Sequence, residues 1–92
     1  MNGKVTRVFE IVNEKGLHAR ASAKFVETVE AYDASAEVMK DGLGASGDSI
    51  MGLLMLAASK GSTIEVTTQG TQSLDRANAI GQLIANRFGE AQ

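Results

Sequence analysis

The chain of 92 residues contains no cysteine, no proline and only one histidine. Without cysteine there is no disulfide bond, no thiol nucleophile and no cysteine-ligated metal. A single histidine leaves too few nitrogen ligands for a zinc site, so we expect neither a metal nor a cofactor. The 9 basic residues are outnumbered by 11 acidic residues, which gives a net charge of −2. Because no basic excess is present, we expect no nucleic-acid partner.

Long hydrophobic runs are also missing. The longest apolar stretch, residues 50–58, is far shorter than the roughly 20 residues that a membrane-spanning helix needs. Residues 1–4 lack the apolar core of a signal peptide, so we expect a cytoplasmic protein with no membrane insertion. A chain this short, with 43% hydrophobic residues, is expected to form one domain over residues 1–92.

The spacing of apolar residues predicts four strands and three helices. The strands are expected near residues 5–12, 34–38, 43–46 and 63–67, and the helices over 19–31, over 50–58 and from Ser73 to Phe88. Asp41-Gly42 is typical of a hairpin turn between the second and third strands. The order β-α-β-β-α-β-α indicates an α+β domain with helices on one face of a mostly antiparallel sheet.

The histidine lies in the run Gly16-Leu17-His18-Ala19-Arg20, where the first predicted strand gives way to a helix. If His18 is the N-cap, the backbone N–H groups that follow have no intrahelical acceptor and favour an anion beside the imidazole. Arg20 could bind the same anion, and an imidazole nitrogen is a competent nucleophile. This pattern favours a phosphoryl relay over the alternative, a histidine that only decorates the surface or caps a helix.

A second pair of motifs, Ser49-Ile50-Met51-Gly52 and Lys60-Gly61, follows at a matching distance. Together with the histidine run, they make the whole chain resemble HPr, the histidine-containing phosphocarrier family of the bacterial phosphoenolpyruvate-dependent phosphotransferase system. The resemblance implies an open-faced sandwich, in which three helices cover one face of a four-stranded antiparallel sheet of order 1-4-2-3.

The resemblance also implies roles for the residues around the histidine. His18 would be phosphorylated on its Nδ1 atom by enzyme I and dephosphorylated by an enzyme IIA, while Arg20 and the backbone of Ala19 and Arg20 hold the phosphate. Such a protein is an intermediate in phosphoryl transfer rather than an independent enzyme. The family usually has proline after the arginine, whereas this chain has Ala21, which is compatible with a first helical turn.

Ser49 has two interpretations. The matching serine in part of the family is phosphorylated by an ATP-dependent HPr kinase/phosphorylase, which would be a further partner. Alternatively, either Ser49 or Asp48 only caps the next helix, where Lys60-Gly61 would supply the C-terminal stop, and a serine cap contributes about 1 kcal/mol. The rival to the carrier is therefore a regulatory interaction module of the same fold, controlled at Ser49, in which His18 is idle.

The helix at 50–58 has more apolar residues than one buried face requires. Leu53 and Leu56 can fill the core, which leaves a surplus that predicts an exposed docking surface near His18. The alternative is a helix that is fully buried. The expected docking residues are Ala19, Ala23, Lys24, Glu27, Ile50, Met51 and Leu54. A monomer is expected. The choice between sugar uptake and the nitrogen-related branch stays open, although Leu54, Met55 and Ala21 favour a regulatory or atypical branch.

Overall fold

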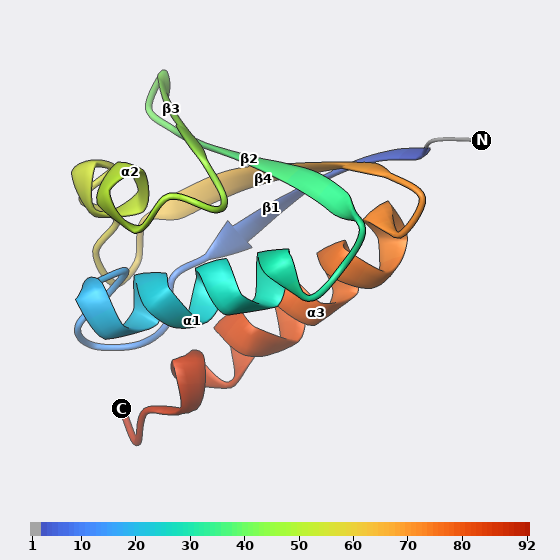
Figure 1. Cartoon of the computed structure of the whole chain (residues 1–92). Helices are drawn as coiled ribbons and strands as arrows, with labels where there is room; N and C mark the ends of the chain where they lie inside the picture. Colours follow the sequence, from blue (N-terminus) through green and yellow to red (C-terminus); the bar gives the residue numbers. More distant parts are fainter. Residues whose placement is uncertain (1–2) are drawn as a thin grey trace.

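A computed structural model describes residues 3–92 of the chain as a sheet and a helical layer (Figure 1). The four strands pair antiparallel in the order β1-β4-β2-β3, which confirms the expected open-faced sandwich. The strands are β1 (Gly3–Glu10), β2 (Ala34–Lys40), β3 (Leu43–Ser46) and β4 (Thr63–Gly70). The helices are α1 (Ala19–Glu30), α2 (Ile50–Met55) and α3 (Ser73–Ala85), followed by the 3₁₀ turn η1 (Arg87–Gly89).

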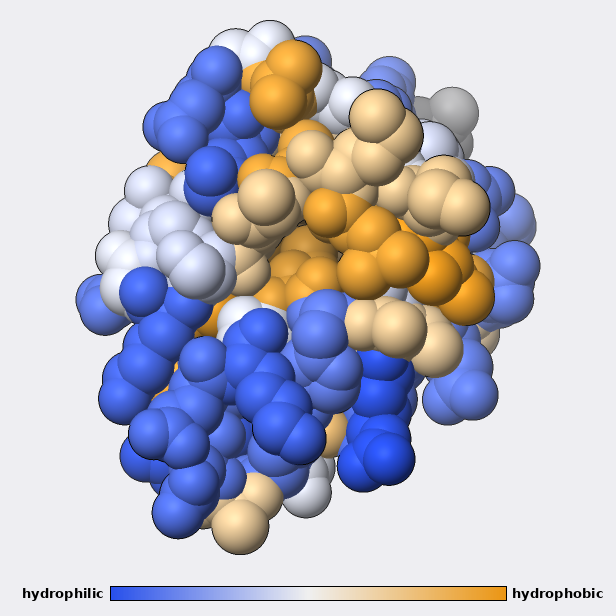
Figure 2. Space-filling model, turned by 90° about the vertical axis from the view of Figure 1, so that its left-hand side faces the viewer, coloured by the Kyte–Doolittle hydropathy of each residue, from blue (hydrophilic) through white to orange (hydrophobic). Residues whose placement is uncertain are grey.

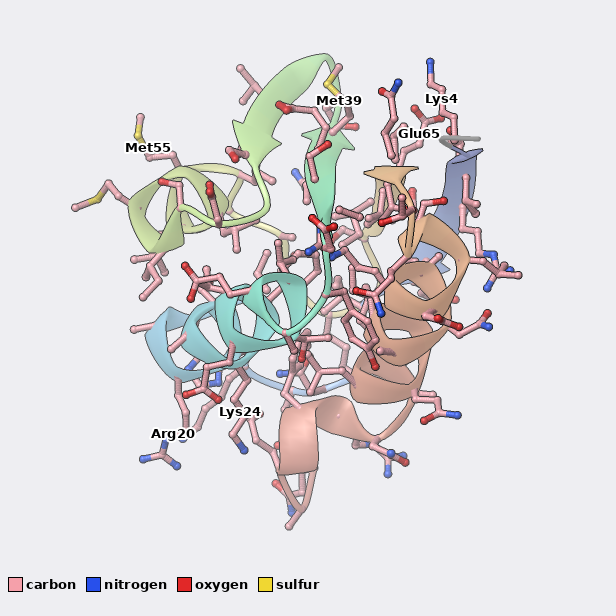
Figure 3. All side chains as sticks on the ribbon, turned by 45° about the vertical axis from the view of Figure 1, so that its right-hand side comes forward. Lys4, Arg20, Lys24, Met39, Met55 and Glu65 are labelled. Carbon is pink, nitrogen blue, oxygen red and sulfur yellow. The ribbon has the colours of Figure 1, made fainter. Side chains whose placement is uncertain are left out.

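Helices α1 and α3 run along one face of the sheet, and α2 packs against α1 and β3 at the sheet's end (Figure 1). The alternation seen in the sequence sorts the strand residues between the two faces. Val38 and Val66 are buried against the helices together with Phe25 of α1. Lys4 and Glu65 are exposed on their strands (Figure 3). One face of the sheet therefore makes the core and the other stays open.

The hairpin between β2 and β3 forms at the predicted dipeptide. Asp41 and Gly42 both have positive φ, 50° and 83°, which matches the right-handed twist of the flanking strands. Glycine tolerates this conformation, and aspartate is among the few other residues that visit it routinely. Even the shortest predicted strand, Leu43–Ser46, pairs with β2 over its full length.

Two helix ends differ from the sequence-based prediction. Helix α2 ends at Met55 rather than residue 58, because Ala57 adopts a left-handed conformation with φ 52°. The glycine expected to stop α2, Gly61, lies instead in the turn before β4, where its N–H donates to the Ile11 carbonyl over 2.8 Å. Phe88, predicted on the last helix, lies in η1, although it is completely buried as expected.

Residues 3–92 contain no helix with the length and apolar character needed to cross a membrane. The sequence predicts that residues 1–4 lack the apolar core of a signal peptide. Two of these residues, Met1 and Asn2, lie outside the described residues.

Candidate functional site

His18 is the N-cap residue of α1, as the sequence predicts. Its backbone is extended, with φ −78° and ψ −175°, and its carbonyl accepts the N–H of Ser22 over 2.8 Å. The imidazole does not cap the helix, so the first-turn N–H groups of Ala19 and Arg20 lack a helical acceptor. The side chain is 26% exposed. The structure therefore places an accessible imidazole beside free amides at the positive end of a helix dipole.

The loop before His18 is anchored to the segment after α2. Leu17, which is buried, donates its N–H to the Ala58 carbonyl over 2.8 Å. Gly16 has φ +66°, and a Cβ at this position would clash with the same carbonyl and lie 2.9 Å from Ser59 Cα. Only glycine fits such a close approach with a positive φ. The glycine before the histidine thus fixes the position from which α1 begins.

A residue that the sequence did not indicate completes the surroundings of His18. Glu90, after the last helix, directs its Oε2 atom onto Nε2 of His18. Its other oxygen, Oε1, accepts a hydrogen bond of 3.0 Å from Nδ2 of Asn13, which also donates to the Gly16 carbonyl over 2.8 Å. The histidine motif itself contains no carboxylate partner, and the structure supplies one from 72 residues farther along the chain.

The charge state of Glu90 follows from these contacts. Burial alone would raise the pKa of its carboxyl group. The hydrogen bonds from Asn13 and His18, with the nearby charges of His18 and Lys15, outweigh burial and lower the pKa. Glu90 is therefore ionised at neutral pH and can only accept hydrogen bonds.

A cleft of about 390 Å³ lies between the start of α1 and the C-terminal segment. Its cationic lining residues are Lys15, Arg20 and Lys24, and Glu90 closes one side. Arg20 projects into solvent (Figure 3) and, within residues 3–92, forms no ion pair. Lys24, expected on the rim of a docking surface, donates to the Phe88 carbonyl over 2.7 Å and so tethers the C-terminal segment to α1. Three cationic side chains and the carboxylates of Glu14 and Glu90 thus line a cleft beside the histidine.

Ser49 is the N-cap of α2, which decides between the two expected capping residues. Its Oγ accepts the N–H of Gly52 over 3.0 Å. The Asp48 carboxylate is engaged differently, because it accepts the hydroxyl of Ser46 over 2.6 Å. The Ser49 hydroxyl therefore has a structural role as the cap of α2.

Helix α2 presents the predicted surplus of apolar side chains. Leu53 and Leu56 are buried, whereas Ile50 is 41% and Met51 68% exposed. Met55, absent from the expected docking residues, is 74% exposed and projects away from the helix (Figure 3). We call Ile50, Met51, Met55 and the half-buried Leu54 the α2 patch.

The α2 patch faces the same side as the start of α1. Figure 2 shows an apolar surface directly above a strongly hydrophilic one on this side of the molecule. On α1, Ala19 and Glu27 are exposed and Ala23 is half-buried. The molecule therefore presents an apolar surface next to a hydrophilic one, with His18 between α1 and the C-terminal segment.

The family model described as the PTS HPr component phosphorylation site matches residues 5–86, which include His18. The chain belongs to the HPr family. These proteins are phosphocarriers of the phosphotransferase system. HPr of Neisseria meningitidis serogroup B is 45% identical over 83 residues, covering 90% of this chain and 93% of the relative. HPr of Pseudomonas aeruginosa is 42% identical, covering 89% and 92%.

Solved structures agree with the sequence relatives. HPr of Thermoanaerobacter tengcongensis superimposes with a TM-score of 0.91 at 33% identity, covering 96% of this chain and 99% of that structure. HPr of Bacillus anthracis gives a TM-score of 0.84 at 31% identity, covering 88% and 96%. The fold of this chain is thus shared with the HPr structures from these two bacteria.

Proposed function

We propose that this HPr protein accepts a phosphoryl group on His18 from phospho-enzyme I and passes it to an enzyme IIA. The observation that supports this most is the position of the imidazole at the N-cap of α1, next to amides that lack acceptors. A phosphate on the ring would meet the backbone N–H groups of Ala19 and Arg20 at the positive end of the helix dipole.

Arg20 adds a charge that nothing else in the described chain neutralises through an ion pair. Its guanidinium can make charge-assisted hydrogen bonds to phosphate oxygens once the ring is modified. Because the His18 side chain is 26% exposed, a phosphoryl group on it stays accessible to an acceptor protein. A carrier requires this combination, since it must receive the group and release it again.

Partner binding is assigned to the α2 patch and to the expected α1 residues Ala19, Ala23, Lys24 and Glu27. Of these, Lys24 lies against the C-terminal segment and Glu27 borders α3, rather than the α2 patch. The exposed methionines are flexible and suit a surface that fits both a donor and an acceptor. Successive use of one surface by several partners favours a monomer, and we propose that it acts in the cytoplasm. Sedimentation at working concentrations tests the monomer.

The central experiment incubates the protein with phosphoenolpyruvate and purified enzyme I. We expect an acid-labile phosphate on the wild-type protein and none on His18→Ala. Subsequent addition of an enzyme IIA should remove the phosphate. A correctly folded wild-type protein that takes no phosphate from its cognate enzyme I would contradict the carrier and favour the regulatory module.

Docking is tested separately with Met51→Glu, which places a charge in the α2 patch. We expect weaker binding to enzyme I and slower phosphoryl uptake, with the melting temperature unchanged because the side chain is exposed. The matched control is Met39→Glu, since Met39 is an exposed methionine on β2, away from α2 (Figure 3). Equal transfer rates in both variants would remove the α2 patch from the proposal.

For the regulatory alternative, a specific observation is that Ser49 caps α2 and lies beside the α2 patch. A phosphate at this position would place negative charge next to the docking surface and near Asp48. Incubation with ATP and host lysate, followed by mapping of phosphoserine, tests this modification. Label that persists in Ser49→Ala would exclude Ser49 as its site.

A further inference from the structure

The contact between Glu90 and His18 fixes the position of one proton. An ionised carboxylate accepts hydrogen bonds but cannot donate them, so Nε2 of His18 must carry the hydrogen in this contact. In a neutral imidazole only one nitrogen is protonated. The lone pair therefore resides on Nδ1, the ring atom that the carrier mechanism uses.

We propose that Glu90 is a positioning residue for phosphoryl transfer, which holds the proton on Nε2 and orients the ring so that Nδ1 is the nucleophile. The inference rests on the proposed carrier function and adds a residue to it. Glu90 lies beyond the segment matched by the family model, residues 5–86. It reaches the histidine because the chain turns back after α3 through η1.

Asn13 fixes which groups donate the hydrogen bonds to Glu90. It is completely buried, and its Nδ2 group donates to both the Gly16 carbonyl and Oε1 of Glu90. The hydrogen bonds therefore run from Asn13 to Glu90 and from His18 to Glu90, with both neighbours donating. A carboxylate can accept from both sides, whereas a side-chain amide cannot.

The transfer step balances with this proton placement. The Nδ1 lone pair attacks phosphorus and forms the N–P bond, while the bond between phosphorus and the donor breaks and its electron pair leaves with the donor. No proton needs to leave the ring, because Nε2 keeps its hydrogen throughout. Positive charge that develops over the imidazole is then stabilised by the adjacent carboxylate. In the reverse direction, the same steps return the neutral tautomer.

The substitution Glu90→Gln tests the proposal because it preserves the shape of the side chain and reverses the direction of its hydrogen bond with His18. Its carbonyl oxygen must face Asn13, which can only donate at this point, so its NH₂ group must face His18. An NH₂ donor requires a lone pair on Nε2 and thereby moves the proton to Nδ1. We expect the tautomer population to shift towards Nδ1–H and phosphoryl uptake from enzyme I to fall by about tenfold.

Because the chain has one histidine, ¹⁵N NMR of histidine-labelled protein reports this ring without overlap. In the neutral ring of the wild type we expect a protonated Nε2 and an unprotonated Nδ1. Glu90→Ala, which removes the acceptor without adding a donor, should give an intermediate tautomer ratio and rate. Glu65→Gln is the matched control, since it removes an exposed carboxylate on β4 and should change neither measurement.

A wild-type ring with its proton on Nδ1 would overturn the proposal, as would Glu90→Gln with the tautomer and uptake rate of the wild type. A merely structural role would lower the stability of the variant without inverting the tautomer. Failure of the carrier function looks different, because the wild type itself would then take no phosphate. The NMR measurement would still decide whether Glu90 determines which ring nitrogen of His18 carries the proton.

Discussion

Gly16→Ala should destabilise the contact between the loop before His18 and the segment after α2. The magnitude follows from two separate costs, a backbone cost and a steric cost. An alanine at φ +66° costs about 1–2 kcal/mol in backbone strain, and about 0.4–1 kcal/mol of this is offset by the lower entropy of the unfolded chain. The net backbone cost is therefore about 1 kcal/mol.

The steric cost comes from the neighbouring chain. The added Cβ would collide with the Ala58 carbonyl, which accepts the N–H of Leu17. Moving this carbonyl weakens a hydrogen bond that contributes about 1 kcal/mol. Displacing the buried Leu17 adds about 1 kcal/mol more, at the lower end for an overpacked core. We expect Gly16→Ala to lower the free energy of unfolding by about 3 kcal/mol in total.

Gly42→Ala separates the two costs. Gly42 also has a positive φ, +83°, but a Cβ there would meet nothing within 4 Å. Denaturant titration of both variants should therefore show a loss of about 1 kcal/mol for Gly42→Ala and a larger loss for Gly16→Ala. Phosphoryl uptake should fall only in Gly16→Ala, because this loop places His18. Equal losses of stability in the two variants would refute the steric reasoning.

Two further predictions concern stability. Ser49→Ala removes the acceptor for the Gly52 N–H and should cost about 1 kcal/mol by denaturant titration, and a cost near zero would show that the cap contributes nothing. Because the folded protein lowers the pKa of Glu90, its ionised form contributes stability above the unfolded pKa, and this contribution is lost as pH falls through the folded pKa. Acid titration of the unfolding midpoint should show a smaller loss in Glu90→Ala than in the wild type, and identical acid profiles would contradict this assignment.

Local patterns were sufficient to predict most of the fold. Alternation in the strands and caps at the helices depend on neighbours in the sequence, and all four strands and three helices form. The strand order came from the family resemblance, since pairing joins segments far apart in the chain. The end of α2 was missed because Ala57, a good helix former, adopts a left-handed conformation that its side chain does not favour.

The residues of the site likewise divide into those that a local sequence pattern predicts and one that it does not. His18, Ala19 and Arg20 were predictable because an N-cap and its first turn are contiguous in sequence. Glu90 was not, because a single carboxylate near the end of a chain carries no local pattern. Its approach depends on η1, where the non-glycine residues Arg87 and Phe88 both have positive φ. No sequence rule predicts two such residues in succession.

The core explains why this unusual turn persists. Two non-glycine residues in the left-handed region cost about 1–2 kcal/mol each, and complete burial of the Phe88 side chain offsets about 1.5–3 kcal/mol. The Lys24 ammonium holds the Phe88 carbonyl in addition. The backbone strain and the burial of Phe88 nearly balance. Phe88, a core residue two positions before Glu90, therefore determines whether the carboxylate reaches His18.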